Sequence, residues 1–252
     1  MSWVEWQGET LPTTKDIASL DLTVEAPDVD GPRQSWRFEL AHLIPNRNRA
    51  PDDWRHLQTL NVSIAEMGIQ VRDWRELAGL TIRTTPQWLA QVEGCGPYAQ
   101  LVDPSMEISH CKMTPGKREF ELNDDWMSIE YELRFGQWDD GCLACELDAW
   151  AVPSEEYHRT EPETPEELAS FAMGPPNLRV ITRAAFDGGR IEMERCGDDP
   201  TPLALQRLRE QVGEVEVVDA RVHWPSRYAN GPANPPVKEP GWRGKVSFRT
   251  GW

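Results

Sequence analysis

The segment from Met127 to Ala151 constrains the fold more than any other part of the chain. Apolar side chains occupy every second position on both sides of a central turn, Gly136 to Gly141. Such alternation is typical of strands with one buried face, so the segment predicts a β-hairpin. With the apolar side chains on one face, the other face carries Glu130, Glu132, Glu146 and Asp148. Like charges directly opposite one another destabilise a sheet, so this cluster requires an explanation.

Shorter runs with the same alternation recur through the chain. They are Leu20 to Val24, Trp36 to His42, Leu60 to Val71, Met106 to Met113 and Lys117 to Leu122. In the third run the apolar phase slips near Ala65 and Glu66, which predicts a β-bulge. We therefore expect a mainly β (α+β) protein, built as an antiparallel β-sandwich or partly open barrel with a few short helices.

The pattern divides the chain into three parts. We expect an antiparallel β domain over 1–153, an acidic connection with a short helix over 154–176, and a ββαβ extension over 177–252. Thr164-Pro165-Glu166-Glu167 and Thr201-Pro202 resemble helix starts, and Gly213 is a helix stop. Asp187-Gly188-Gly189 predicts a hairpin turn in the extension. The Pro- and Gly-rich tail beyond Pro225 is basic, and we expect it to lie back across the acidic body.

The charge of the chain restricts its partners. A net charge of −16 and a pI near 4.7 argue against nucleic acid and anionic membranes, whose phosphates attract Lys and Arg. We see no signal peptide and no membrane-spanning run. Five cysteines fit free thiols better than a disulfide framework, so we expect a cytoplasmic protein.

The carboxylate face can be extended on the sequence. Lys117 to Leu122 is expected to lie beside the first hairpin strand, which places Glu119 next to Glu130. The candidate binding residues are then Glu119, Glu130, Glu132, Glu146, Asp148 and Trp150. Three explanations stay open: a solvated face, a face covered by Arg side chains from elsewhere such as the tail, or a functional face.

One functional interpretation is enzymatic. Cys145 to Trp150 resembles the Glu-x-Asp-x-(x)-Glu strand of laminarinase- and lichenase-type glycoside hydrolases, over about five residues. The resemblance implies a jelly roll with Glu146 as nucleophile and Asp148 as its modulating neighbour. Trp150 stands where that pattern requires the acid/base carboxylate. Retaining hydrolysis needs a second carboxyl roughly 5 Å away.

Metal binding has weaker support. Asp124-Asp125 and Asp139-Asp140 lie in turns that could offer oxygen ligands to Ca²⁺, but neither has the full spacing of an EF-hand. Cys142 and Cys145 have the C-x-x-C spacing, with His110-Cys111 as candidate partners for zinc, yet on a strand they face opposite sides. We expect no cofactor and no metal. His42, on the apolar face of its strand, is expected to be a hydrogen-bonded core histidine.

The function expected from these observations is a non-enzymatic acidic protein-binding module. It would hold a cationic protein on the carboxylate and Trp150 face, and a bacterial immunity protein that neutralises a basic toxin is one concrete form. The alternative is a carbohydrate-active hydrolase that uses carboxylates around Glu146. The sequence leaves the oligomeric state open.

Overall fold

The computed structural model describes most of the chain. The described residues are 2–11, 15–26, 34–44, 58–84, 106–113, 120–156, 164, 166, 167, 170, 173–194, 200–223 and 243–251. They form a mainly β structure around one mixed sheet, which confirms the predicted fold class.

The strands pair into a ring that carries a side extension. The ring strands are β3 (Lys15–Val24), β4 (Gln34–Ile44), β5 (Gln58–Met67), β7 (Met106–Met113), β8 (Phe120–Asp139), β9 (Cys142–Pro153) and β10 (Leu178–Glu194). They pair in the order β10-β3-β4-β5-β7-β8-β9, and β9 pairs with β10 again. The β10–β3 pair is parallel, and the other pairs in the ring are antiparallel. The shorter strands are β1 (Trp3–Trp6), β2 (Glu9–Thr10), β6 (Thr81–Thr84), β11 (Val217–His223) and β12 (Arg243–Thr250).

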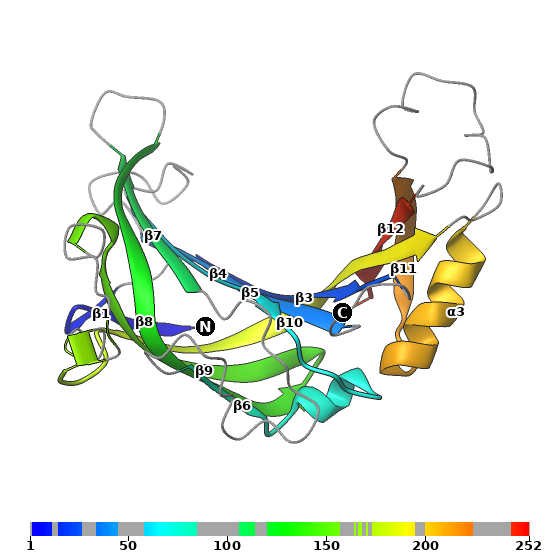
Figure 1. Ribbon diagram of the computed structural model, residues 1–252, viewed down its shortest axis with the longest axis horizontal. Helices are drawn as coiled ribbons and strands as arrows, with labels where there is room; N and C mark the ends of the chain where they lie inside the picture. Colours follow the sequence, from blue (N-terminus) through cyan, green and yellow to red (C-terminus); the bar gives the residue numbers. More distant parts are fainter. Residues whose placement is uncertain are drawn as a thin grey trace.

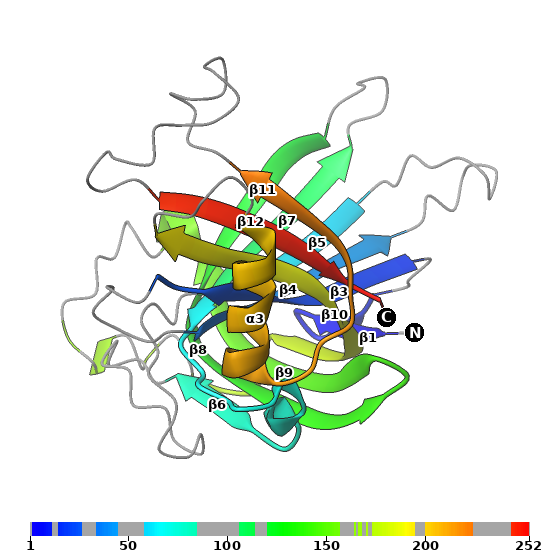
Figure 2. The ribbon, with the colours of Figure 1, turned by 90° about the vertical axis from the view of Figure 1, so that its right-hand side faces the viewer.

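The ring is flattened and strongly curved. Figure 1 shows β3, β4 and β5 along the floor of a trough that rises toward β7 and β8 at one end and β11 and β12 at the other. Strands β6, β8 and β9 lie beneath this floor. Helix α3 (Thr201–Val212) packs outside the β11 end, across β10 and β11 (Figure 2).

The core fills the inside of the ring. Alternate side chains of every ring strand are buried there and form one cluster, because successive residues of a strand point to opposite faces. Among the largest are Trp36, Phe38, Tyr131 and Phe186, each no more than 1% exposed. The other described side chains of the same strands face outward, so the polar half of each alternating run forms the outer surface of the ring.

Two local predictions are confirmed by the strand registers. In the β4–β5 pair, Phe38 lies opposite Ile64 while Trp36 lies opposite Met67, so the extra residue of a bulge falls at Ala65 and Glu66. Strands β8 and β9 form the predicted hairpin. Its turn is Asp140-Gly141, where both residues have positive φ, as in the type I′ turns favoured by twisted hairpins.

The prediction of a hairpin turn at Asp187-Gly188-Gly189 is wrong. Residues Leu178–Glu194 form one strand, with only a bulge between Phe186 and Gly188. The glycines lie where β10 passes between β3 and β12, and a Cβ on Gly189 would collide with the Leu22 carbonyl oxygen. Glycine here permits close backbone approach rather than chain reversal. The expected ββαβ order is therefore wrong: the chain runs β10-α3-β11-β12, and the end of the basic tail is a strand hydrogen-bonded between β10 and β11.

The prediction that Lys117 to Leu122 forms a separate strand beside the hairpin is also wrong. Phe120 to Asp139 is one long strand, and β7 pairs with its first part. Its register slips twice against β9, between Ser128 and Glu130 and between Phe135 and Trp138. Trp126 and Trp138 consequently pack against the core, in edge-to-face contact with Trp6 and Trp74. Both indole rings therefore pack on the core side of the hairpin and not on its outer face.

The predicted helix signals are confirmed where the structure describes them. Thr164 and Glu167 form a reciprocal capping box, each backbone N–H donating to the other side chain. Asp73 caps the single 3₁₀ turn Trp74–Leu77. Helix α3 ends at Gly213, which has φ +80°. Among the described residues, no helix is long and apolar enough to cross a membrane.

Candidate functional site

The four predicted hairpin carboxylates do share one outer face. We call the outer side of β6, β8, β9 and the first half of β10 the ladder face. Across it the register aligns Arg179, Asp148, Glu132 and Arg83 in one row, continued on β1 by Glu5. Two negative residues, Glu132 and Asp148, are therefore direct neighbours in the middle of the row.

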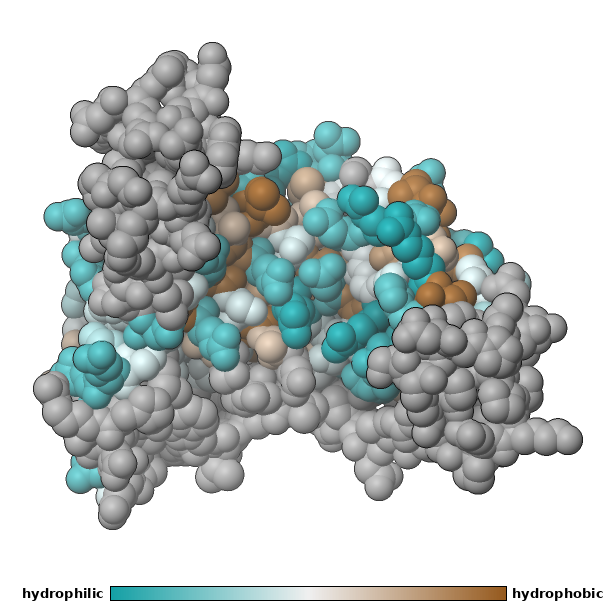
Figure 3. All heavy atoms as spheres, turned by 90° about the horizontal axis from the view of Figure 1, so that it is seen from above, coloured by the Kyte–Doolittle hydropathy of each residue, from teal (hydrophilic) through white to brown (hydrophobic). Residues whose placement is uncertain are grey.

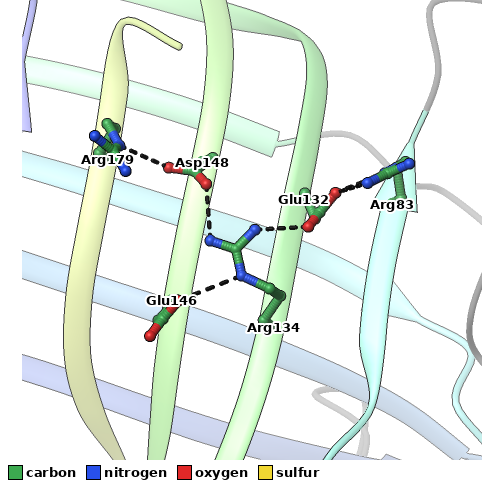
Figure 4. A network of polar contacts seen from close by, with 6 residues as sticks. All are labelled: Arg83, Glu132, Arg134, Glu146, Asp148 and Arg179. Carbon is green, nitrogen blue, oxygen red and sulfur yellow. Dashed lines mark hydrogen bonds and ion pairs between the residues drawn. The ribbon is translucent and has the colours of Figure 1, made fainter. Parts of the chain in front are cut away.

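Arg134 lies in the adjacent row and compensates this repulsion (Figure 4). Its guanidinium donates to Glu132 Oε1 at 2.6 Å and Asp148 Oδ2 at 2.8 Å, and lies 3.3 Å from Glu146 Oε2. At the ends of the row, Arg83 pairs with Glu132 through an Nε–Oε2 contact of 2.7 Å, and Arg179 with Asp148 at 3.0 Å. Three carboxylates, those of Glu132, Glu146 and Asp148, thus meet three guanidiniums, and most of the charge of the ladder face is compensated.

The pKa values follow from these contacts. Partial burial alone would raise the pKa of Glu132, but hydrogen bonds from Arg83 and Arg134 outweigh it and lower the pKa. Arg134 and Arg179 lower the pKa of Asp148 in the same way. The pKa of Glu130 is raised, chiefly by burial. The central carboxylates are therefore firmly ionised, and their charges are already used within the protein.

The remaining predicted site residues are Glu119 and Trp150. Strand β6, which brings Arg83 opposite Glu132, is the neighbour of this part of β8 in place of the expected strand Lys117 to Leu122. Glu119 itself lies outside the described residues. Trp150 lies directly opposite Glu130, and its Nε1 donates to the Gly174 carbonyl at 3.0 Å. Of the three explanations left open by the sequence, coverage by arginine fits best, although these arginines come from β6, β8 and β10 rather than the tail.

This geometry does not favour glycoside hydrolysis. A retaining mechanism needs one carboxyl held protonated as an acid beside an ionised nucleophile. Here Arg134 contacts both Glu146 and Asp148, and it stabilises the ionised form of Asp148. The two carboxyls that share Arg134 with Glu146, those of Glu132 and Asp148, both have lowered pKa values, so neither is held protonated as an acid.

A second polar face, which the sequence did not single out, covers the floor of the trough. We call the outer side of β3, β4, β5, β7 and the second half of β10 the trough face. Small side chains make up much of it: Ser19, Ala41, Asn61, Ser63, Ser109 and Ala185. Among the described side chains, its acidic residues include Asp21, Glu39, Glu107, Asp187 and Glu192, and its basic residues include Arg37 and Arg190; Glu192 pairs with Lys245 of β12 at 2.8 Å. Figure 3 looks onto this face and shows hydrophilic side chains over its middle with hydrophobic ones beside them.

Charge on the trough face is less compensated than on the ladder face. Among the described residues, Arg37 and Glu39 form a 3.4 Å ion pair with both side chains about half exposed. Burial, together with the nearby Glu39 and Asp187, raises the pKa of Asp21 to about 6, against the opposing effects of Arg37 and the Ser19 hydroxyl. An Asp carboxylate held in this environment at neutral pH costs folding free energy. Asp21 was visible in the sequence only as an alternating polar residue, since Asp187 was assigned to a turn.

Inside the ring, a buried polar chain joins three strands to the N-terminal segment. Asp16 Oδ1 lies 2.5 Å from His42 Nδ1, and Asp16 Oδ2 accepts from the Ser2 backbone N–H at 2.9 Å. The Ser2 hydroxyl meets that of Thr182 at 2.5 Å. His42 is fully buried, as expected for a hydrogen-bonded core histidine. This chain is inaccessible to a substrate and ties β1, β3, β4 and β10 together.

The described residues contain no cluster of His, Cys, Asp or Glu that could hold a metal ion. Burial raises the pKa of the Cys145 thiol to about 12, which makes it an unreactive core side chain. Both predicted metal sites involve residues whose side chains lie partly outside the described set.

No protein-family model, curated protein or solved structure matches this chain. Function must be argued from the two faces themselves.

Proposed function

We propose that this protein is a non-enzymatic binding module for a cationic protein. An immunity protein that neutralises a basic toxin remains one concrete form. The chain charge of −16 supplies long-range attraction for such a partner. The ladder face offers little of that charge, because its arginines already bind the carboxylates.

The observation that carries the proposal is the environment of Asp21. Its carboxylate lies on a concave face, partly desolvated and beside Glu39 and Asp187. Burial and like charge both oppose ionisation there, so the fold loses stability by keeping an acid at this position. Proteins retain such costly groups where function requires them. An arriving Lys or Arg would relieve the repulsion, and we place the partner on the trough face.

Matched charge removal on the two faces tests this proposal. The variant D21N/E39Q and the variant E130Q/E146Q each remove two negative charges and keep the side-chain shapes. Binding of the intact chain to surface-immobilised poly-L-lysine, at low and high salt, is the measurement. We expect D21N/E39Q to weaken binding about tenfold and E130Q/E146Q to have less than a twofold effect. Equal losses in both variants would mean that net charge alone attracts the polymer, and the proposal would be wrong.

A further inference from the structure

The trough face is amphipathic along the direction of β3. At one end, Ile17 is 50% exposed and lies directly opposite Ala41 on β4. At the other end, Asp21 lies opposite Arg37, and Glu39 occupies the row between. Ile17 therefore places a half-exposed apolar side chain on the same face as the Asp21 and Glu39 carboxylates.

The side chains between these two ends of the trough face are mostly small. The intervening row consists of Ala185, Ser19, Glu39, Ser63 and Glu107, in which three of the five side chains are small. Small side chains on a concave sheet leave room for a chain segment to lie along it. The strands rise about 3.3 Å per residue, so Ile17 and Asp21 are roughly 13 Å apart along β3.

We propose that the trough face binds an extended, cationic amphipathic segment of a partner protein. In this complex a hydrophobic side chain of the segment packs on Ile17 and Ala41. A Lys or Arg four residues away along the segment reaches Asp21 and competes with Arg37 for Glu39. In an extended chain, residues four apart point to the same side and are spaced by the same roughly 13 Å. The inference rests on the proposed function and adds the position, conformation and sequence pattern of the partner.

Other occupants fit the face less well. An anionic lipid surface is repelled by the acidic residues around Asp21. A bare metal ion lacks a site, since the described residues bring no ligand cluster together. A purely basic segment would leave Ile17 uncovered. Charge complementarity and the exposed isoleucine together select a segment that is both basic and apolar.

Two synthetic peptides provide the test. One is a Gly/Ser dodecapeptide with Leu at position 4 and Arg at positions 8 and 10; the other has the same composition with Leu moved to position 7, one and three residues from the two arginines and on the opposite side of an extended chain. Titration of each into the intact protein at low salt, followed by calorimetry, gives the two affinities. We expect the four-residue spacing to bind about fivefold more tightly. Ile17→Ser should remove that preference, Asp21→Asn should weaken both peptides, and Glu146→Gln on the ladder face should change neither.

The outcomes separate the two proposals. If neither peptide nor poly-L-lysine binds, the proposed function fails. If cationic probes bind with the same affinity whatever the Leu spacing, and Ile17→Ser has no effect, the amphipathic pattern is wrong while cation binding stands. If Glu146→Gln weakens binding and Asp21→Asn does not, the partner belongs on the ladder face. Ile17 is exposed and Asn is isosteric with Asp, so Ile17→Ser should melt close to the parent and Asp21→Asn at the same or a higher temperature, which excludes unfolding as a cause.

Discussion

Glu132 on β8 lies directly opposite Asp148 on β9, and both carboxylates have lowered pKa values. Two like charges facing each other across a ladder are normally unfavourable. Here the Arg134 guanidinium donates to both, which turns a repulsive pair into a three-residue network. Arg134 therefore allows the hairpin to hold two carboxylates at directly opposed positions.

Replacing Arg134 by methionine should destabilise the protein by about 1 kcal/mol at pH 7. The expected loss is small because the side chain is 36% exposed and solvent screens the pairs. Urea unfolding gives the value. The variant R221M, which breaks an exposed pair with Asp219 on β11, is the control and should cost less. Equal costs would show that Arg134 is only another surface charge.

The same network predicts loss of stability in acid. Glu132 and Asp148 have folded-state pKa values below the ordinary 4.5 and 3.8. A lowered carboxyl pKa contributes stability above the ordinary value, and that contribution disappears as the pH falls through the lowered one. Urea midpoints measured from pH 6 down to pH 3 should therefore decline, and R134M should decline less. A parallel decline in both proteins would contradict this account.

Asp21 should show the opposite dependence on pH. Its pKa of about 6 exceeds the ordinary 3.8, so its ionisation removes stability as the pH rises through that interval. We expect D21N to stabilise the protein by about 1 kcal/mol at pH 7, a value discounted for the partial exposure of the carboxyl. The gain should shrink between pH 6 and pH 4. A destabilised D21N at pH 7 would mean that the carboxylate supports the fold, which would remove the main argument for a binding role.

Gly189→Ala tests the course of β10. Because its Cβ would collide with the Leu22 carbonyl oxygen, we expect a loss of more than about 3 kcal/mol or failure to fold. In a two-residue hairpin turn the same change would cost about 1 kcal/mol. Gly79→Ala is the control, since Gly79 has φ +83° but a Cβ added there would meet no atom within 4 Å. Similar unfolding free energies for the two variants would argue for a turn at Gly188-Gly189.

Substitutions of Trp138 and Trp150 should reduce the free energy of unfolding by clearly different amounts. Trp138 packs edge-to-face on Trp74 with ring centroids 4.5 Å apart, so Trp138→Ala should cost about 3 kcal/mol. Trp150 lies on the ladder face, and Trp150→Phe loses mainly the hydrogen bond to Gly174, worth about 1 kcal/mol. Chemical denaturation of both variants measures the difference. Comparable losses would place Trp138 at the surface.

Local patterns in the sequence identified much of this fold. Alternation in Leu20 to Val24 and Trp36 to His42 correctly assigned buried and outward residues, and the phase slip at Ala65 located a bulge. Such signals are short-range, because the pleat sends successive side chains to opposite faces. The turn predicted at Asp187-Gly188-Gly189 was wrong because its glycines serve a contact with strands distant in the chain. Glycine satisfies both a turn and a close strand crossing, and only the neighbours Leu22 and Phe248 distinguish the two.

The sequence by itself determined that this is a mainly β protein with Glu130, Glu132, Glu146 and Asp148 on one face of a hairpin. Only the tertiary structure decided what surrounds those carboxylates. Strand pairing placed Arg83 and Arg179, distant in the chain, at the two ends of their row, and brought Asp187 beside Asp21 on the other side of the ring. Charge compensation depends on which strands are neighbours, and that choice is made by packing across the whole ring rather than by any local pattern.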